Sequence, residues 1–425
     1  MTVQPLKGTL KVPGDKSISH RAIMFSALAT GKSRIIGLLD SADCMATADC
    51  FRKMGVSIEG SSKSEIIVKG LGLHGLKAPA ETLNAQNSGT TTRLISGILA
   101  AQPFHTMITG DASIQKRPMK RIMEPLKQMG AHIVSVNDNG CAPLSIDGTT
   151  LSGITYHSPV ASAQVKSCIL LAGLYAKGQT IVTEPAISRD HTERMLNACG
   201  APILTDENTK SVCVSTCDRL NPLDVTVPGD ISSAAYFIAA ASLIEGSEVR
   251  LEHVGINPTR DGILRVAKAM GADIRAENVR TVSGEPVADL IIRYAPLIGT
   301  DISGDLIPTL IDELPMIAVM AAFADGTTTI RDAAELRVKE SDRIKAIMEG
   351  LTAMGADVTE LPDGLVINGG NRLHTAKIKT YLDHRIAMSF AVAQTALGVT
   401  IDLDSKDCVR ISYPDFFTDL AALAK

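Results

Sequence analysis

Hydrophobic positions gather in six similar blocks, each an Ala-rich apolar segment followed by a segment rich in β-branched residues. An apolar segment without a polar face is typical of a helix buried on all sides, and the segment after it is typical of a strand. The blocks lie roughly 70 to 80 residues apart and together span the chain. They are FSALATGKSRIIG (25–37), LISGILAAQPFHTMITG (94–110), LLAGLYAKGQTIVTE (170–184), FIAAASLIEGSEVRLE (237–252), VMAAFADGTTTIRDA (319–333) and AVAQTALGVTIDL (391–403).

A second signal recurs between the blocks, where a Gly ends an amphipathic helix and a β-branched strand follows. The Gly indicates a helix C-terminus that needs a left-handed residue. Each unit is therefore predicted to run strand, helix, strand, helix, strand, strand. The signal occurs as MGVSIEG (54–60), MGAHIVS (129–135), CGAPILT (199–205), MGADIRA (270–276) and MGADVTE (354–360).

The tetrapeptide VPGD divides the repeats into two groups of three, since it occurs at 12–15 and again at 227–230. Pro has a fixed backbone angle and Gly a permissive one, a combination that suits crossings between domains. A chain of 425 residues also exceeds what one core usually organises. We therefore expect an α/β protein with two similar domains, residues 14–226 and residues 1–13 with 229–425, joined by a two-strand hinge.

Composition limits the function classes. The net charge of −4 argues against a protein that coats nucleic acid or an anionic membrane, and aromatic residues, at 3% with no Trp, are too few for base stacking. The start, MTVQPLKGTL, has no apolar signal core, and no apolar run approaches the roughly 18 residues of a membrane span. We expect a cytoplasmic protein without nucleic-acid or membrane partners.

Eight scattered cysteines show neither a C-x-x-C pair nor a zinc-type spacing with His, so we expect reduced, mostly buried thiols and no metal site. A lone catalytic Cys is the open alternative. Two phosphate-binding motifs are rejected. GLGLHG (70–75) is followed by a Pro-containing segment rather than an apolar helix, and ATGKS (29–33) ends a helix instead of starting one.

The residues that open the Ala-rich helices are rich in cations and hydroxyls: DKSISHR, NSGTTTR, SAQVKS, DISSAAY, DELPM and DHR. Helix N-termini favour anions, and parallel helices would bring these starts to one face of each domain, across a cleft from the other. Lys16, Ser17 and Arg21 could then hold a phosphate or a carboxylate. The alternative is N-capping by Asp15 or Ser17, with Lys16 and Arg21 in water.

Further cations stand at similar places of the repeats. A single Arg at a helix start usually lies in solvent and has no binding role, but several at equivalent positions are harder to explain in this way. Their number in a chain of net negative charge indicates substrates with several negative charges. The residues are Arg117, Arg189, Lys339 with Glu340 and Arg343, and Asp383 with His384 and Arg385. His20 and His384 are interpreted as orienting or packing groups.

Six motifs, in this order and spacing, resemble the EPSP synthase family, the 3-phosphoshikimate 1-carboxyvinyltransferases. They are VPGDKSISHR, NSGTTTR, QKRPMKR, SAQVKS, RVKESDR and DHRIAM. The match runs end to end, and SAQVKS and SRDHTERM are more similar to the second, mostly bacterial branch. The resemblance implies two domains, each an inside-out α/β barrel of three βαβαββ repeats, that close over the substrates.

The resemblance also implies the reaction and its participants. An enolpyruvyl group moves from phosphoenolpyruvate to the 5-hydroxyl of shikimate 3-phosphate through a tetrahedral intermediate, and phosphate is released. This step belongs to the shikimate pathway, towards chorismate and the aromatic amino acids. No metal or organic cofactor is expected, and the chain is expected to be a monomer.

Matched motif by motif, the resemblance assigns the site residues. Shikimate 3-phosphate would bind Lys16, Ser17, Arg21, Ser162, Ala163, Gln164, Arg189, Asp312 and Lys339. Phosphoenolpyruvate would bind Lys16, Asn87, Gly89, Arg117, Gln164, Arg343 and Arg385. The catalytic residues would be Asp312 as base, Glu340 as proton donor, Lys339 polarising the attacking oxygen, and Lys16. The N-terminal domain would mainly bind shikimate 3-phosphate, and the C-terminal domain would supply the acid and base and bind the carboxylate of phosphoenolpyruvate.

The sequence departs from the first branch at two places. Ala163 replaces a second Ser after Ser162, consistent with phosphate binding by Arg189, and Ile411 replaces a Lys, with Arg410 one position away. Two alternatives stay open. The sister transferase for UDP-N-acetylglucosamine usually has a Lys-Asn pair in place of Lys16 and Ser17 and a reactive loop Cys. A non-catalytic two-domain clamp for an anion would gain nothing from the paired carboxylates.

Overall fold

The structure, a computed structural model, describes residues 3–62 and 64–424. Its contacts divide the chain into two compact units. Gly14–Val227 forms one, called here the N-terminal unit, and Pro228–Lys425 with Met1–Pro13 forms the other, the C-terminal unit. Both divisions fall inside the two VPGD motifs, so the chain passes between the units twice.

The N-terminal unit repeats one pattern three times. In each described sheet the first strand is parallel to the second, and the remaining pairs are antiparallel. The first sheet contains β13 (Asp224–Thr226), β2 (Thr30–Ile36), β4 (Glu65–Leu71) and β3 (Ser57–Gly60), with helices α1 (Lys16–Leu28) and α2 (Ala42–Lys53). The second contains β5 (Leu83–Asn84), β6 (His105–Thr109), β8 (Leu144–Asp147) and β7 (His132–Ser135), with α3 (Gly89–Leu99) and α4 (Lys120–Gln128). The third contains β9 (Thr155–His157), β10 (Thr180–Thr183), β12 (Ser211–Val214) and β11 (Ile203–Asp206), with α5 (Ala163–Gly173) and α6 (His191–Ala198).

The C-terminal unit follows the same pattern, with its first strand taken from the start of the chain. The first sheet contains β1 (Lys7–Leu10), β14 (Glu248–Gly255), β16 (Glu285–Arg293) and β15 (Asp273–Val282), with α7 (Ile231–Leu243) and α8 (Gly262–Ala269). The second contains β17 (Asp301–Ile302), β18 (Thr327–Ile330), β20 (Gly364–Asn368) and β19 (Asp357–Leu361), with α9 (Leu314–Phe323) and α10 (Arg343–Ala353). The third contains β21 (Lys377–Ile378) and β22 (Asp402–Leu403), with α11 (His384–Leu397) and α12 (Phe416–Leu423).

The sixth repeat differs from the predicted βαβαββ order, because no pair of antiparallel strands follows its second helix, α12, in the described residues. The sequence gives the reason, since the Gly signal that precedes those strands occurs five times and not six. Phe416, Leu420 and Leu423 of α12 still join the buried core of the unit.

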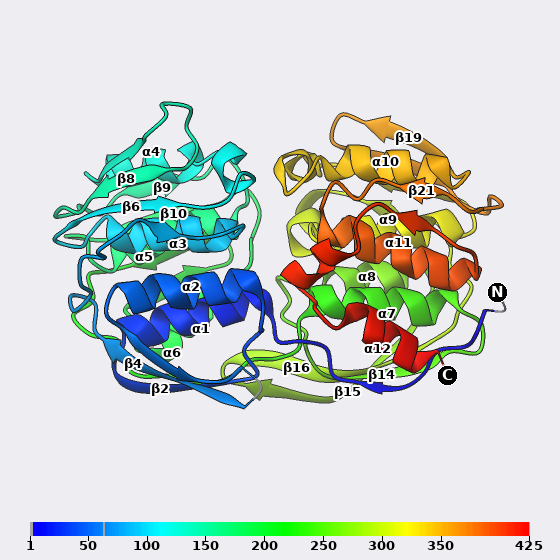
Figure 1. Ribbon diagram of the computed structural model, residues 1–425, viewed down its shortest axis with the longest axis horizontal. Coiled ribbons are helices and arrows are strands. Elements are labelled where there is room, and N and C mark those ends of the chain that lie inside the picture. Colours follow the sequence, from blue (N-terminus) through cyan, green and yellow to red (C-terminus); the bar gives the residue numbers. More distant parts are fainter. Residues whose placement is uncertain (1–2, 63, 425) are drawn as a thin grey trace. The chain divides into compact units, whose positions relative to one another are not determined.

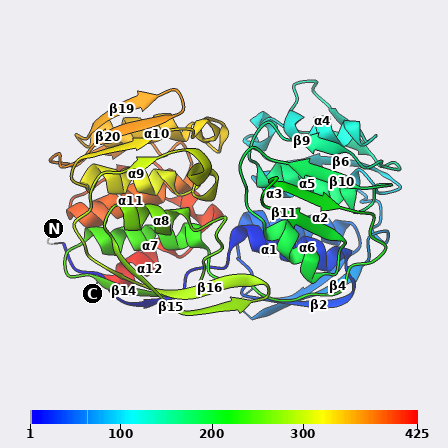
Figure 2. The ribbon, with the colours of Figure 1, turned by 180° about the vertical axis from the view of Figure 1, so that it is seen from behind.

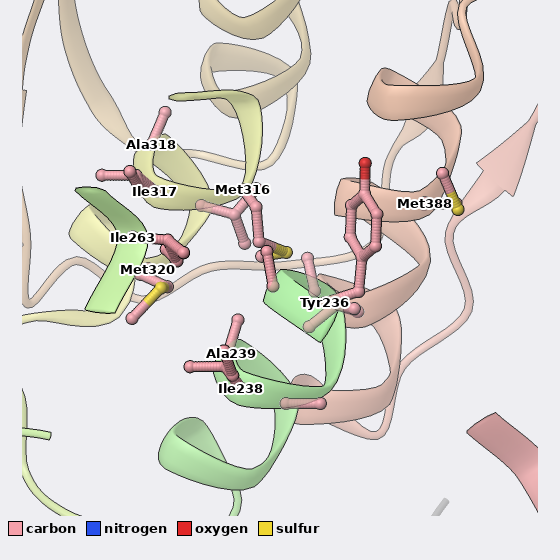
Figure 3. Close-up of a cluster of buried hydrophobic side chains, with 14 of the residues drawn as sticks. Tyr236, Ile238, Ala239, Ile263, Met316, Ile317, Ala318, Met320 and Met388 are labelled. Atoms are coloured by element: carbon pink, nitrogen blue, oxygen red, sulfur yellow. The ribbon is translucent and has the colours of Figure 1, made fainter. Parts of the chain in front are cut away.

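The Ala-rich helices are buried, as their apolar pattern predicts. In the C-terminal unit α7, α9 and α11 lie side by side (Figures 1 and 2), and every residue of α7 from Ile231 to Ser242 is buried. Figure 3 shows side chains of these helices meeting, among them Tyr236, Met316 and Met388. Each unit is thus an inside-out α/β barrel, with helices in the core and sheets around them.

Each predicted Gly stop has a positive backbone angle φ, between 77° and 95°. The five are Gly55, Gly130, Gly200, Gly271 and Gly355. Since other residues adopt this conformation only with strain, the interpretation as left-handed helix ends is confirmed. The rejected motifs also lie as expected. GLGLHG begins at the end of β4 and is followed by β5 rather than by a helix, and ATGKS follows the end of α1 and leads into β2. None of the described helices has the length and hydropathy needed to cross a membrane.

Candidate active site

Side-chain caps open five of the six Ala-rich helices. Asp15, Ser88, Ser162, Asp230 and Asp383 each accept a hydrogen bond from a backbone N–H in the first turn of the helix that follows. Such caps pair donors that would otherwise lack a partner at a helix start. Capping by Asp15 is therefore real, but it does not account for the cations beside it.

Lys16 and Arg21 are not simply solvated, as the capping alternative assumes. Lys16 forms an ion pair with Asp43. Arg21 is 3% exposed, and its guanidinium donates to Thr192 Oγ1 at 2.7 Å and to Ser167 Oγ at 2.8 Å. Burying a guanidinium among hydroxyls fixes its direction, which suits the binding of an anion.

The starts of α1 and α5 lie close to the loop before α6. Arg189 in that loop donates to Ser17 Oγ at 3.4 Å, so two residues predicted for the same ligand meet. Ser162 and Gln164 stand at the start of α5, on either side of Ala163, and all three are half-buried. Ser17, Arg189 and the start of α5 thus belong to one polar region of the N-terminal unit.

A second group of predicted residues surrounds Gly89 at the start of α3. Arg117 donates to Asn87 Oδ1 at 2.8 Å. A Cβ atom placed on Gly89 would lie 2.8 Å from a terminal nitrogen of Arg93 and 3.4 Å from one of Arg117. Arg93 also donates to Gln164 Oε1 at 2.5 Å. Two guanidinium groups therefore stand over a residue that has no side chain to obstruct them.

Arg93 was missed by sequence reasoning, although it is the last residue of the motif NSGTTTR. Its place one turn into α3 puts it on the same face as Gly89, because residues four apart lie one above the other on a helix. That spacing was the available signal.

In the C-terminal unit three cations surround the carboxylate of Asp312. Lys339 Nζ lies 3.5 Å from it, a terminal nitrogen of Arg343 lies 3.4 Å away, and Arg385 reaches to 4.0 Å. Arg385 also donates to the backbone carbonyl of Asp312 at 3.0 Å. The structure thus gathers three predicted cations from separate elements around one predicted carboxylate.

Arg343 connects this carboxylate with two more. It donates to Glu340 Oε2 at 2.7 Å and to Asp383 at 2.8 and 3.3 Å. Burial alone would lower the pKa of the Arg343 guanidinium, but the negative charges of Asp383 and Glu340 raise it. Burial by itself would raise the pKa of Asp383, and the charge of Arg343 lowers it instead. Each ion therefore keeps the other charged in the interior.

A buried network that the sequence did not reveal lies behind Arg385. The carboxylate of Glu313 accepts a hydrogen bond from Ser232 and lies 3.7 Å from Arg260 and 3.9 Å from Arg385. Burial would lower the pKa of Arg385, but the charges of Asp312, Glu313 and other neighbours raise it. Arg260 lies in none of the quoted motifs, so only the folded structure brings it here.

The remaining expected residues have simpler surroundings. His20 is fully buried and its Nδ1 lies 2.7 Å from Thr47 Oγ1. Burial, followed by the nearby charges of Lys16 and Arg21, holds the pKa of His20 well below its ordinary value, which fits a packing role. His384, at the start of α11, is also buried. Arg410 is exposed at the end of the 3₁₀ turn Asp407–Ile411.

The buried cysteines are poor nucleophiles. All eight are free thiols and six are buried. Burial raises the pKa of four of them to about 12, which disfavours the reactive thiolate. The four are Cys44, Cys50, Cys168 and Cys199.

The family model described as EPSP synthase (3-phosphoshikimate 1-carboxyvinyltransferase) matches residues 1–420. The chain belongs to the EPSP synthase family. Two relatives named 3-phosphoshikimate 1-carboxyvinyltransferase come from Synechococcus sp. and Desulforamulus reducens. The first is 55% identical over 100% of this chain and 96% of its own length, and the second 52% identical over 97% and 96%.

Solved structures agree with the family. The EPSP synthase from Acinetobacter baumannii superposes with a TM-score of 0.87 at 47% identity and covers 100% of this chain and 96% of its own. The enolpyruvyl transferase NikO from Streptomyces tendae has a TM-score of 0.78 at 17% identity, over 99% and 95% of the two chains, and supports the fold alone. The sequence-based predictions of the EPSP synthase family and its fold are confirmed, and the UDP-N-acetylglucosamine alternative is not favoured.

Proposed function

We propose that the polar regions of both units act on one pair of substrates in the EPSP synthase reaction. The enolpyruvyl group of phosphoenolpyruvate is transferred to the 5-hydroxyl of shikimate 3-phosphate, giving 5-enolpyruvylshikimate 3-phosphate and phosphate. The family membership of residues 1–420 supports the reaction. The observation that carries the site assignment is the carboxylate of Asp312 with Lys339, Arg343 and Arg385 within 4.0 Å.

Shikimate 3-phosphate is proposed to bind mainly to the N-terminal unit. Arg189 and Ser17 stand 3.4 Å apart, close enough to hold one phosphate together, and Arg21 is fixed behind them by hydroxyl groups. Lys16 would exchange Asp43 for a substrate anion. The start of α5, with Ser162, Ala163 and Gln164, completes the proposed site.

Phosphoenolpyruvate is proposed to bind to arginines of both units, with a different charged group of the substrate at each. Arg117, Asn87 and Gly89 would hold its phosphate together with Lys16 and Gln164, and Arg343 with Arg385 would hold its carboxylate. Two polyanions repel one another in water, and cations fixed in a site that excludes water reduce this repulsion. Holding both reactants in line removes a further part of the barrier.

The proton transfers are assigned to the carboxylates. Asp312 accepts the proton of the 5-hydroxyl, and the oxygen then forms a bond to C2 of phosphoenolpyruvate while C3 receives a proton from Glu340, which has to be protonated when the substrates are bound. Lys339, at 3.5 Å from Asp312, is placed to polarise the attacking oxygen, and Lys16 supports the charge that develops. Glu340, now a carboxylate, then takes a proton back from C3 as phosphate leaves C2, which gives the enol ether.

The test is to identify the product after incubation with both substrates. Proton NMR should show the two vinyl protons of an enolpyruvyl ether attached to shikimate 3-phosphate, together with free phosphate. Unchanged substrates would overturn the proposal. Two predictions remain, namely that the protein is a monomer and that it is cytoplasmic. Light scattering on the purified chain tests the first.

A further inference from the structure

Three charged side chains are buried together behind the start of α5. The amine of Lys166 lies 2.9 Å from Glu184 Oε2 and 2.7 Å from Glu193 Oε1, and it donates to the backbone carbonyl of Ser188 at 3.3 Å. The exposed fractions of the three charged side chains are 2%, 3% and 5%. Lys166, Glu184 and Glu193 are called here the buried triad.

The triad is connected to two predicted ligand-binding positions. One oxygen of Glu184 accepts a hydrogen bond from the backbone N–H of Ser162 at 3.0 Å, and the other accepts from the hydroxyl of Ser188 at 2.8 Å. Ser162 caps α5, and Ser188 directly precedes Arg189. One carboxylate therefore fixes the start of α5 and the loop that carries Arg189.

The same layer also reaches Arg21. Arg21 donates to Ser167 and Thr192, the neighbours in sequence of Lys166 and Glu193, and these two hydroxyl oxygens lie 2.6 Å apart. Three residues predicted to bind shikimate 3-phosphate, namely Ser162, Arg189 and Arg21, are thus held from behind by α5, α6 and the loop between β10 and α6.

Stability alone does not explain such an arrangement. The desolvation of buried ions costs about as much as their attraction returns, so apolar side chains of similar volume would stabilise the unit as well. Burial would lower the pKa of Lys166, but Glu193 and Glu184 raise it, which keeps the amine charged. Directional bonds to fixed oxygens give what apolar packing cannot, namely an orientation for the groups in front.

We propose that Lys166 is a positioning residue for shikimate 3-phosphate. It holds Glu184 between Ser162 and Ser188, and it offsets one of the two negative charges that would otherwise stand behind an anionic ligand. This inference rests on the proposed function, since it concerns the same site, and it assigns no contact between Lys166 and substrate.

The test compares Lys166→Met with Lys177→Met, a matched change at an exposed lysine of the same unit. Titration calorimetry with shikimate 3-phosphate alone gives Kd, and steady-state kinetics give KM for each substrate. We expect Lys166→Met to raise Kd and KM for shikimate 3-phosphate about 10-fold or more, as loss of positioning does, with kcat and KM for phosphoenolpyruvate changed less than about 3-fold. Lys177→Met should behave as wild type.

A second substitution separates charge balance from packing. One cation and two carboxylates leave a formal charge of −1, which Lys166→Met changes to −2 and the double variant Lys166→Met with Glu193→Gln returns to −1. We expect the double variant to recover most of the affinity for shikimate 3-phosphate. Equal affinity of Lys166→Met and wild type, or an equal rise of KM for both substrates, would overturn the proposal.

Two further results keep the test decisive. If Lys166→Met does not fold, Ser188→Ala removes the hydroxyl on Glu184 and leaves every charge in place. It should weaken binding of shikimate 3-phosphate about 3-fold, the effect of one hydrogen bond, and wild-type affinity in this variant would overturn the proposal. If the wild-type chain neither binds shikimate 3-phosphate nor turns over both substrates, the proposed function itself fails.

Discussion

Asp383 accepts two hydrogen bonds from the guanidinium of Arg343, at 2.8 and 3.3 Å, and the exposed fractions of the two side chains are 0% and 1%. The pair spans the start of α11 and the start of α10. Because Arg343 also contacts Asp312 and Glu340, Asp383 sets the direction of a cation that the proposed mechanism uses.

Asp383→Asn should therefore harm both stability and binding. Arg343 then keeps only Glu340 and Asp312 as charged partners, and breaking a buried ion pair from one side costs up to about 3 to 5 kcal/mol. Urea unfolding should show this loss, and KM for phosphoenolpyruvate should rise more than KM for shikimate 3-phosphate. A variant as stable as wild type with unchanged kinetics would show that the pair has neither role.

Asp312→Asn should lower turnover while binding persists. Loss of a general base typically costs about 100-fold or more in kcat, and the amide keeps the size of the carboxyl group. Kinetics with both substrates and calorimetry with shikimate 3-phosphate separate the two effects. Asp301→Asn, at an exposed position of the same unit, is the control. Wild-type kcat for Asp312→Asn would remove Asp312 from the proton transfer.

Gly89→Ala should weaken the site for phosphoenolpyruvate. The new methyl group would lie 2.8 Å from a terminal nitrogen of Arg93, so one guanidinium has to move. We expect KM for phosphoenolpyruvate to rise several-fold, by about 1 kcal/mol of binding, with KM for shikimate 3-phosphate unchanged. A rise in KM for shikimate 3-phosphate alone would place Gly89 at the other ligand.

The family resemblance also implies that glyphosate, a phosphonate inhibitor of the family, competes with phosphoenolpyruvate, because no side chain at Gly89 obstructs a small anion beside Arg93 and Arg117. Inhibition kinetics at several phosphoenolpyruvate concentrations measure this directly. Inhibition that phosphoenolpyruvate does not relieve would mean that the inhibitor binds elsewhere.

His20 should make stability fall as the pH falls below its ordinary pKa of 6.5. Burial lowers the pKa of His20 in the folded chain, so below pH 6.5 the unfolded chain binds a proton that the folded chain does not. The resulting loss of folding stability is small above pH 6.5 and reaches about 1 kcal/mol at one pH unit below it.

The free energy of urea unfolding at pH 7.5 and pH 5.5 tests this dependence. His20→Asn should lose less stability over this interval than wild type, by roughly 1 kcal/mol. His132→Asn, at an exposed position, is the matched control. Equal losses in His20→Asn and wild type would contradict the assignment.

Local signals made most of the fold predictable. A Gly stop such as Gly55 and a cap such as Asp15 are written within a few residues of the element they end or begin. The burial of the Ala-rich helices follows from the lack of a polar face on each. The prediction of six complete repeats was wrong for the sixth. The sequence held the signal for this, since the Gly stop occurs only five times.

The partners of the site residues were less predictable, because they come from distant parts of the chain. Lys16 with Asp43, and Lys166 with Glu184 and Glu193, become neighbours only when the helices pack. The motifs named the residues predicted to face a ligand. The residues that position those side chains, such as Glu184 and Glu193, form no recognisable motif in the sequence.

Phosphate release measured with both substrates and with each one alone tests the central claim most directly. The account predicts steady release only when phosphoenolpyruvate and shikimate 3-phosphate are both present, at a rate unchanged by a metal chelator and with one phosphate formed for each enolpyruvyl ether. No release with both substrates, equal release from phosphoenolpyruvate alone, or loss of turnover with the chelator would contradict it.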